Sequence, residues 1–329
     1  MKIAYLLCSI YYGGVEKIVI DSLNGLCEAN ETLLIVPYGC EFKDRLDKRV
    51  QIYEYKSYDK RYNAFLYLEI LRVLKDFGAV LLHSHGVKAT QMGFVLQKFA
   101  NFRLVGTKHN ARKGKIFNKI KNVIAISKTV ATSIKNSSKV LYFGIKPVAI
   151  KRANLPKNPF IITAVGRLDF IKGFDELIKI CANLKFDFCL KIVGSGSERQ
   201  NLLNLATSLG IENKVEFVGF SDEIPQILAS SHLQVISSRN EGLPLVLIEG
   251  LFYSPVVIST PVGGIGEILH SDFLVMHQNM GEKICEIYEN YEKIALEFEK
   301  KHSKIKENLK FESFISNLQN YYKEVLCKA

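Results

Sequence analysis

The sequence predicts an α/β protein built from two doubly wound domains with parallel sheets. Three observations predict this class. The chain has 329 residues and is 48% hydrophobic, which is enough for two cores of ordinary size. Two apolar, β-like runs each lead into a glycine turn: KIAYLLCSIYYGG from residue 2 and FIITAVGRL from residue 160. Behind both runs, short apolar segments alternate with helical patterns, as strands alternate with crossover helices in a parallel sheet.

In the first half, further strands are expected at AVLLHSHG, FRLVGTKHN and NVIAISK. Helical periodicity predicts crossover helices over residues 61–77 and 87–99. The polar stretch KRANLPKNP, residues 151–159, marks the expected end of this half. We therefore expect a first domain over residues 1–155.

In the second half, strands are expected at FCLKIVGSG, KVEFVGF, LQVISS and PVVIST, each followed by a helix candidate. The second domain is expected over residues 156–310. The charged, periodic segment 281–326 predicts C-terminal helices, of which the last, within 311–329, is expected to cross back to the first domain.

The two halves carry opposite net charge. Residues 1–157 hold 27 Lys and Arg against 11 Asp and Glu, whereas residues 158–329 hold 17 against 22. This asymmetry favours an anionic partner for the first half, such as acidic lipid headgroups, a phosphorylated glycan or nucleic acid. An ordinary solvated surface is the alternative.

The lengths of the apolar runs and the spacing of the cysteines indicate where the protein is located and whether its thiols are free. Its apolar runs are shorter than the roughly 18 residues of a membrane span, and the run at residues 3–10 is too short for a secretory signal. Seven scattered cysteines without a Cys-x-x-Cys pair, and the lack of any Asp-x-Asp, favour free thiols and no bound metal or cofactor. We expect a cytoplasmic protein.

The segment EGLPLVLIEG, residues 241–250, places a glutamate on each side of an apolar run. Proline suits the first turn of a helix, so Pro244 places Glu241 in the preceding loop and Glu249 within the helix. The backbone N–H groups of Leu245 and Val246 and the helix dipole then favour a phosphate at the helix N-terminus. Carboxylates on either side accept hydrogen bonds from hydroxyls. The segment predicts a cradle for a sugar nucleotide.

A second motif, VGRLDFIKGFDEL, supports this interpretation from another strand end. Gly166 allows a tight turn, and Arg167 and Lys172 follow five residues apart. Two preorganised cations stabilise the charge that builds on a departing diphosphate. A salt-bridged turn between strand and helix would explain either motif alone.

Together these motifs resemble the retaining glycosyltransferases of family 4, and the resemblance is densest over residues 162–269. It implies the GT-B fold, in which two Rossmann-like domains face each other across a cleft. Glu241 and Glu249 match the E-x7-E pattern of that family. Gly194 in VGSGSERQNL and Phe220 in VEFVGF fall in its nucleotide-flanking loops.

In the first half, Gly13 and Gly14 of YYGGVEK resemble the glycine loop that approaches the donor phosphates, and GTKHN resembles the strand end carrying an active-site histidine, His109. LYFGIKP departs from the family, because Phe143 and Lys146 stand where asparagine and aspartate are common. The resemblance assigns the diphosphate to Arg167 and Lys172. It assigns the ribose to Glu249, the sugar to Glu241, and a position facing that sugar to His109.

The implied activity is metal-independent transfer, with retained configuration, from a UDP-sugar to a glycan or lipid-linked acceptor. Bacterial lipopolysaccharide, oligosaccharide or capsule assembly is the expected setting, on a cytoplasmic membrane face and without nucleic acid. Two rivals stay open: a sugar-nucleotide epimerase, and a catalytically silent binding subunit.

Three segments of the first half allow two interpretations each. His83 and His85 of HSHG are either packed side chains or, for His85, a group near the substrate. Residues 112–121, RKGKIFNKIK, predict a basic amphipathic helix that rests on an anionic membrane or packs on the domain. Residues 52–62, IYEYKSYDKRY, interleave aromatic and basic side chains as lipid and nucleic-acid surfaces do, but would equally suit a surface strand.

Overall fold

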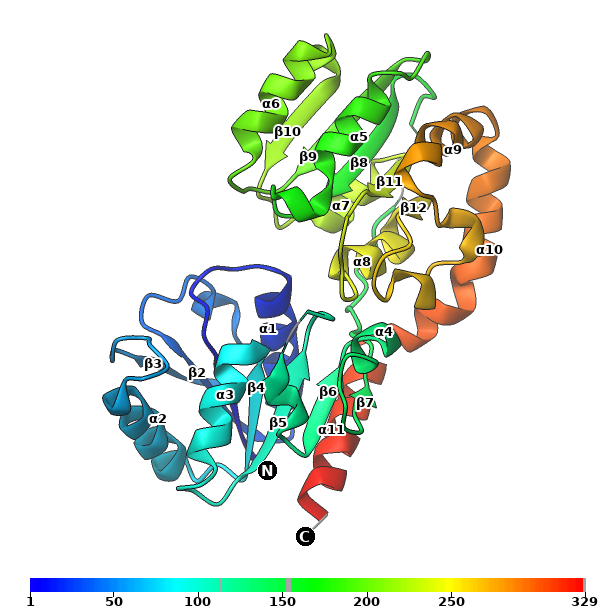
Figure 1. Cartoon of the computed structure of the whole chain (residues 1–329). Helices are drawn as coiled ribbons and strands as arrows, with labels where there is room; N and C mark the ends of the chain where they lie inside the picture. Colours follow the sequence, from blue (N-terminus) through cyan, green and yellow to red (C-terminus); the bar gives the residue numbers. More distant parts are fainter. Residues whose placement is uncertain (113, 152–154, 328–329) are drawn as a thin grey trace. The chain divides into compact units, whose positions relative to one another are not determined.

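The computed structural model describes residues 1–112, 114–151 and 155–327. Its contacts divide into two compact units (Figure 1). Unit 1 comprises Met1–Phe143 and Glu312–Ala329, and unit 2 comprises Gly144–Phe311. Each unit contains one parallel sheet with helices beside it, so the predicted class of two doubly wound α/β domains is confirmed.

Unit 1 has a seven-stranded sheet in the order β3-β2-β1-β4-β5-β6-β7. Every pair of neighbours is parallel. Strands β1, β2 and β4 are buried at every position after the first residue of β1 and of β2, as expected for a sheet covered on both faces. The strands are β1 (Lys2–Leu7), β2 (Glu31–Pro37), β3 (Gln51–Tyr55), β4 (Leu81–His85), β5 (Arg103–Lys108), β6 (Asn122–Ala125) and β7 (Lys139–Val140).

The helices of unit 1 are α1 (Gly14–Leu26), α2 (Ala64–Phe77), α3 (Gly86–Leu96), α4 (Lys128–Ala131) and α11 (Phe311–Cys327), with short 3₁₀ turns η1 (Lys43–Arg45) and η2 (Lys115–Asn118). Helix α2 shows how local sequence sets its bounds. The side chain of Asn63 accepts a hydrogen bond from the backbone N–H of Phe65, and Gly78 ends the helix at a φ of 72°.

Residues 112–121 do not form the predicted amphipathic helix. Only a single 3₁₀ turn, η2, is present there, and Ile116, Phe117 and Ile120 are buried in unit 1; Lys113 lies outside the described residues. The apolar residues of this segment therefore belong to the core, and its exposed groups are cations such as Lys115 and Lys119.

Helix α11 is attached to the sheet of unit 1 through a buried polar cluster. The hydroxyl of Tyr322 lies 2.6 Å from that of Tyr5 on β1 and 2.5 Å from Nδ1 of His83 on β4. The other ring nitrogen of His83 lies 2.6 Å from Oγ1 of Thr107 on β5. Burial lowers the pKa of His83 to about 3, so the ring is neutral and can both donate and accept. A fully bonded polar cluster of this kind specifies one docking position for the helix.

Unit 2 has a five-stranded sheet in the order β10-β9-β8-β11-β12, again parallel throughout. Its strands are β8 (Phe160–Val165), β9 (Phe188–Val193), β10 (Val215–Gly219), β11 (Leu233–Ile236) and β12 (Val257–Ser259). Its helices are α5 (Phe174–Cys181), α6 (Arg199–Ser208), α7 (Ile224–Ala229), α8 (Leu245–Tyr253), α9 (His277–Glu289) and α10 (Tyr291–Asn308), with 3₁₀ turns η3 (Phe170–Lys172), η4 (Glu212–Lys214), η5 (Ile265–Glu267) and η6 (Ser271–Phe273).

The start of unit 2 precedes its first strand. Ile145 forms a parallel bridge with Lys310, and the backbone N–H of Val148 donates to the hydroxyl of Tyr253 at 3.0 Å. Contacts thus group these residues with unit 2, although the sequence placed the boundary at residues 155 and 156. Within the described part of the chain, no helix is long and apolar enough to cross a bilayer.

Both sheets reverse their strand order at one point. In unit 1 the chain moves outward from β1 through β2 to β3 and then returns to the other side of β1 with β4; in unit 2, β8 and β11 are the corresponding neighbours. Such a switch point leaves a crevice outside the carboxyl ends of its two strands, where ligands bind in doubly wound sheets. The loops after β1, β4, β8 and β11 are therefore the places to look for a site.

Candidate functional site

The loop after β8 brings Lys172 back over the end of its own strand. A Cβ atom added to Gly166 would lie 3.2 Å from Cδ and Cε of Lys172, so the aliphatic part of the lysine packs directly on this glycine. The turn η3 places Lys172 there, and Gly173 follows with a φ of 65°. The glycines of the motif thus direct the lysine toward the switch point.

Glu241 reaches the same place from the loop after β11. Its Oε1 accepts hydrogen bonds from Nζ of Lys172 at 2.6 Å and from Oγ of Ser238 at 2.8 Å. Both members of the ion pair are mostly buried. Gly263 touches this loop from behind, since a Cβ atom at that position would lie 2.1 Å from the carbonyl oxygen of Glu241. Two residues that are 69 positions apart in sequence therefore form one charged pair between the two strand ends.

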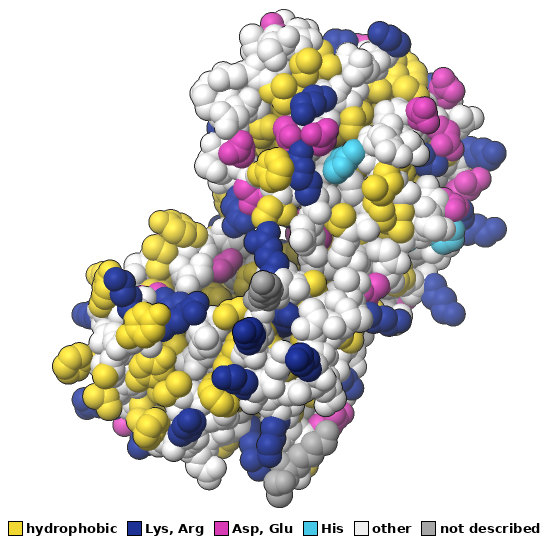
Figure 2. Space-filling model, viewed as in Figure 1, with side chains coloured by type: hydrophobic (Ala, Val, Ile, Leu, Met, Phe, Trp, Pro, Cys, Tyr) yellow, Lys and Arg dark blue, Asp and Glu magenta, His cyan; other side chains and the backbone are white. Residues whose placement is uncertain are grey.

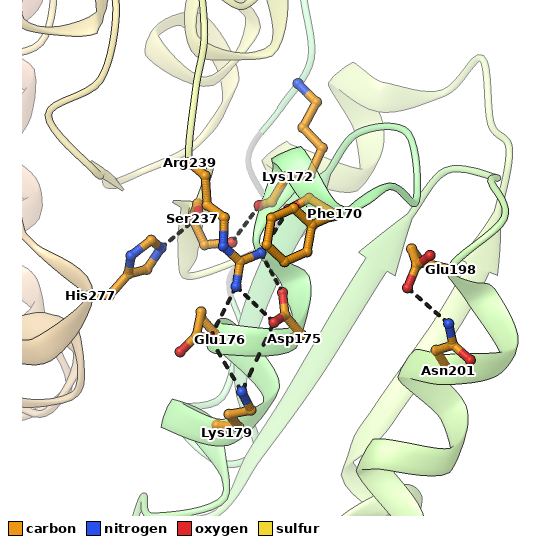
Figure 3. Close-up of polar contacts among 10 residues, drawn as sticks. All are labelled: Phe170, Lys172, Asp175, Glu176, Lys179, Glu198, Asn201, Ser237, Arg239 and His277. Carbon is orange, nitrogen blue, oxygen red and sulfur yellow. Dashed lines mark hydrogen bonds and ion pairs between the residues drawn. The ribbon is translucent and has the colours of Figure 1, made fainter.

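Arg239 connects the two loops that carry this pair (Figure 3). Its guanidinium donates to both carboxylate oxygens of Asp175 at 2.7 Å and to Glu176 at 3.0 Å, at the start of α5. It also donates to the carbonyl oxygen of Phe170 at 2.7 Å and lies 4.0 Å from the centre of that ring. Burial alone would raise the pKa of Asp175, but the bonds and charge of Arg239 outweigh it and lower that pKa.

Ser237, the first residue after β11, is held from two sides. Its hydroxyl donates to the carbonyl oxygen of Lys172 at 3.0 Å, and its own carbonyl oxygen lies 2.7 Å from Nε2 of His277 at the start of α9. A Cβ atom at Gly173 would lie 2.1 Å from that carbonyl oxygen. The loop after β11 is consequently fixed by contacts with the loop after β8 and with α9. Figure 3 shows Lys172 extending away from the carboxylates of α5.

Sequence reasoning missed Arg239, Ser237 and His277. Arg239 carried one available signal, because it lies two residues before Glu241 in the same loop. His277 is 40 residues from Ser237, and no spacing rule connects them.

The other predicted residues of unit 2 lie in the loop after β8, in α8 and after β9 and β10. Arg167 is exposed, and its Nε donates to Oδ2 of Asp169 at 2.7 Å. Helix α8 begins directly after Pro244, so Leu245 and Val246 form its first turn. As predicted, Glu241 lies in the preceding loop and the partly buried Glu249 lies within the helix.

Gly194 follows β9 and Phe220 follows β10. Gly194 has a φ of 138°, and a Cβ atom there would lie 2.0 Å from the carbonyl oxygen of Gly166, so close packing of the two loops requires a glycine. Phe220 is an exposed aromatic side chain.

Unit 1 gathers histidines at the carboxyl ends of β4 and β5. Nδ1 of His85 lies 3.1 Å from Nε2 of His109, and the ring of His109 stacks on Phe143 with centres 5.9 Å apart. Burial lowers the pKa of His109 to about 4 and that of His85 well below its usual value. These rings are therefore neutral at physiological pH and act as hydrogen-bonding groups rather than charges.

The glycine loop of unit 1 follows the neighbouring strand end. Gly13 is the N-cap of α1 and Gly14 its first residue, after the end of β1. Because β1 and β4 are parallel neighbours, this loop and His85 lie at the same edge of the sheet. Among the described residues, no group of three or more His, Cys, Asp and Glu side chains is placed to hold a metal ion.

A sequence model for the family described as glycosyl transferases group 1 matches residues 146–310, just over half of the chain. The chain belongs to this family. It is thus a glycosyltransferase, and the matched residues contain the whole sheet of unit 2 with the Lys172–Glu241 pair.

Individual proteins and solved structures that resemble this chain are also glycosyltransferases or share its fold. The chain is 28% identical over 313 residues to an uncharacterized glycosyltransferase of Haemophilus influenzae, covering 86% of this chain and 88% of that protein. It is 25% identical over 291 residues, 79% of each chain, to a Campylobacter jejuni enzyme named GalNAc-alpha-(1->4)-GalNAc-alpha-(1->3)-diNAcBac-PP-undecaprenol alpha-1,4-N-acetyl-D-galactosaminyltransferase. The structure of Anabaena Alr3699/HepE in complex with UDP-glucose superposes with a TM-score of 0.86 over 98% of this chain and 100% of that chain, at 20% identity. The last likeness shows the GT-B fold alone.

Proposed function

We propose that this glycosyltransferase is a metal-independent retaining enzyme of family 4 that transfers a sugar from a UDP-sugar to a glycan or lipid-linked glycan. Bacterial surface polysaccharide or oligosaccharide synthesis is the setting we propose, at the cytoplasmic face of the membrane. The observation that carries the proposal is the 2.6 Å ion pair between Lys172 and Glu241 at the switch point of unit 2.

The proposed donor site uses both partners of that pair. The diphosphate lies between Lys172, Arg167 and the first turn of α8, where the helix dipole and backbone N–H groups favour negative charge. Glu241 then accepts hydrogen bonds from the sugar and Glu249 from the ribose. Gly194 and Phe220 flank the nucleotide in this proposal. Gly13, Gly14 and His109 are proposed to contact the phosphates and the sugar.

The proposed chemistry is a same-face displacement. The bond between the anomeric carbon and the diphosphate oxygen breaks while the bond to the acceptor oxygen forms on that face, and the acceptor proton passes to the departing phosphate. Lys172 and Arg167 stabilise the negative charge on the leaving group, and Lys172, which is mostly buried and held in place by its contacts, does this better than water would. A neutral His109 donates or accepts a hydrogen bond without repelling either cation.

Two comparisons support the choice of donor and acceptor. The Anabaena structure contains UDP-glucose, and the Campylobacter enzyme is named for an undecaprenol-linked glycan. The basic first half of this chain also suits an anionic membrane.

A panel of UDP-, GDP- and ADP-sugars tests the donor by thermal stabilisation, and product analysis with and without acceptor separates transfer from epimerisation. The anomeric configuration of the product, determined by NMR, tests retention. If no nucleotide sugar raises the melting temperature, or the product has inverted configuration, the proposal is wrong.

Variants test the residue roles. Arg167→Ala removes an exposed cation, so turnover should fall about 100-fold while the melting temperature changes little. Lys172→Ala should lower turnover at least as much, and Glu249→Ala should mainly weaken donor binding in calorimetric titration. Lys179→Ala, a nearby exposed lysine paired with Glu176, is the matched control and should retain full turnover.

A further inference from the structure

The structure separates the two segments that the sequence connected with a lipid surface. In residues 112–121 the apolar side chains of Ile116, Phe117 and Ile120 are buried, so the described residues of this segment offer no apolar side chain to a membrane. The large apolar side chains that follow β3 are, by contrast, exposed to solvent. Tyr58, Tyr62, Phe65 and Leu68 are exposed by 69%, 92%, 76% and 62%, respectively.

Helix α2 explains why these side chains point outward. Its inner face packs against the sheet through Leu66, Ile70 and Leu74, all buried. Phe65 and Leu68 are three residues apart and lie together on the opposite face. The core of unit 1 makes no use of them. Together with Tyr58, Lys60, Arg61 and Tyr62 they form what we call the aromatic surface, and Figure 2 shows hydrophobic and basic side chains side by side on the α2 flank of unit 1.

Basic groups dominate the exposed charge of this surface. Lys60 and Arg61 are exposed, and Nζ of Lys60 lies 5.0 Å from the centre of the Tyr58 ring. Nearby, Nζ of Lys56 lies 5.7 Å from the exposed ring of Tyr38. Aromatic rings beside cations are the combination that settles at the headgroup level of a bilayer.

The carboxylates of the same region are bound within the protein. Glu69 accepts hydrogen bonds from the backbone N–H groups of Lys56 and Ser57 and from the hydroxyl of Tyr53. Glu54 accepts from two backbone N–H groups and from Lys43, and Asp59 pairs with Lys88. Cations pair with Glu54 and Asp59, and Glu69 is turned toward backbone N–H groups, so these carboxylates oppose an anionic partner less than exposed, unpaired carboxylates would.

The aromatic surface also lies at the functional edge of the sheet. It begins in the loop after β3 and continues into the first turns of α2. Because all strands of unit 1 are parallel, this is the edge that carries the Gly13–Gly14 loop, His85 and His109.

We propose that the aromatic surface docks unit 1 on an anionic lipid bilayer and presents this edge of the sheet to an acceptor held in that bilayer. The part concerning the acceptor rests on the proposed function, whereas the docking does not. A second copy of the chain is disfavoured as the occupant, because two identical basic surfaces repel each other.

Flotation of the full chain with vesicles tests the docking. Vesicles of phosphatidylglycerol and phosphatidylethanolamine should bind the protein, and vesicles of phosphatidylcholine alone should bind it at least tenfold more weakly. The double variant Phe65→Ser/Leu68→Ser should lose tenfold or more in affinity without a lower melting temperature, since both side chains are exposed. Leu296→Ser, an equally exposed leucine (73%) on α10 of unit 2, is the matched control and should bind as the parent does.

Charge reversal separates the two basic segments. Lys60→Glu/Arg61→Glu should weaken binding more than tenfold at low salt, because each cation near an anionic surface contributes about a fivefold gain in affinity. Lys115→Glu/Lys119→Glu should have a smaller effect. If the second pair abolishes binding and the first does not, or if the parent fails to float with anionic vesicles, the assignment of this surface is overturned.

The remaining outcomes are equally decisive. A Phe65-dependent dimer in sedimentation velocity, or an RNA that binds the surface and excludes vesicles, would overturn the lipid assignment. UDP-sugar stabilisation is measured on the same variants and should not change. If the unmodified chain binds a UDP-sugar but no anionic vesicles, only the docking is contradicted. If the unmodified chain binds anionic vesicles but no nucleotide sugar, only the proposed function is contradicted.

Discussion

Unit 1 and unit 2 reach the same strand order around their switch points, but they place different kinds of polar group there. In unit 2 the strand ends carry charged pairs, Lys172 with Glu241 and Arg239 with Asp175. In unit 1 they carry neutral rings, including His85 and His109. Ion pairing in unit 2 and the loss of charge in unit 1 both lower the cost of burying these groups, although Nε2 of His85 is buried without a hydrogen-bond partner.

This difference suggests different roles for the two units in the proposed donor and acceptor binding. Charged groups in unit 2 suit a diphosphate, whose charge changes during reaction. Neutral imidazole rings in unit 1 can both donate to and accept from hydroxyl groups. The following predictions test whether the two units respond differently to acid, to backbone change and to loss of single groups.

Acidification should lower the free energy of unfolding more than any substitution below, and unit 1 should lose stability first. Folded His83 and His109 have pKa values lowered to about 3 and about 4, while unfolded histidine titrates near 6.5. The unfolded chain therefore binds more protons below about pH 6.5, and each such histidine lowers the free energy of unfolding by about 1.4 kcal/mol per pH unit until its folded pKa is reached.

Hydrogen exchange of peptides from β4, β5 and α11, corrected for intrinsic rates, should report this loss between pH 7 and pH 5. His232 and His302 of unit 2 also have pKa values lowered by burial, so its stability should fall too, but its switch-point loops contain no such cluster among the described residues. If the amides of unit 1 were equally protected from exchange at pH 7 and pH 5, the buried histidines would not be neutral as stated.

Gly173→Ala should destabilise unit 2 by about 3 kcal/mol, because a positive φ and an overlap with the Ser237 carbonyl oxygen coincide there. Gly210→Ala is the matched control: its φ of 68° is similar, but its Cβ atom would have nothing within 4 Å. Urea unfolding should show a loss of about 1 kcal/mol for the control. Equal losses for the two variants would mean that the loop contact is not tight.

Tyr322→Phe should cost unit 1 about 2 kcal/mol, since it removes the partner of Nδ1 of His83 and one partner of the Tyr5 hydroxyl in a buried cluster. Exchange of α11 should rise most. Tyr321→Phe, at the adjacent buried tyrosine outside this cluster, should have a smaller effect. If the two substitutions were equivalent, the polar cluster would not be what holds the helix.

Arg239→Met should have the smallest effect on stability, about 1 kcal/mol, because its carboxylate partners stay partly hydrated. Its effect on activity should be larger: about a tenfold loss of kcat/KM for the donor, mainly in KM, since the loop that positions Glu241 is no longer tied to α5. Arg239→Lys should restore only part of it, because lysine lacks the bidentate fork. If Arg239→Met lowers the melting temperature but leaves KM unchanged, the role of Arg239 is structural only.

Much of the fold could be predicted because its signals are local. Buried parallel strands read as short apolar runs, and several of them lead into glycine turns, so β1, β4 to β6 and β8 to β12 were expected close to where they lie. Strand β2 was not predicted from ETLLIVP, and residues 112–121 were predicted as a longer helix than the single turn observed. In that segment three apolar residues serve the core, which periodicity alone does not distinguish from a lipid-facing stripe.

The sequence by itself determined that Lys172 and Glu241 follow the ends of two strands of one parallel sheet, because glycine turns, a helix-starting proline and apolar runs act within a few residues of each other. Only the tertiary structure decided that these two strands are neighbours. It also decided that Arg239 and His277 fix the loop after β11 and that Tyr322 bonds to His83. Those contacts join residues 40 to 239 positions apart. Their partners are chosen by packing of the whole unit, which no local pattern encodes.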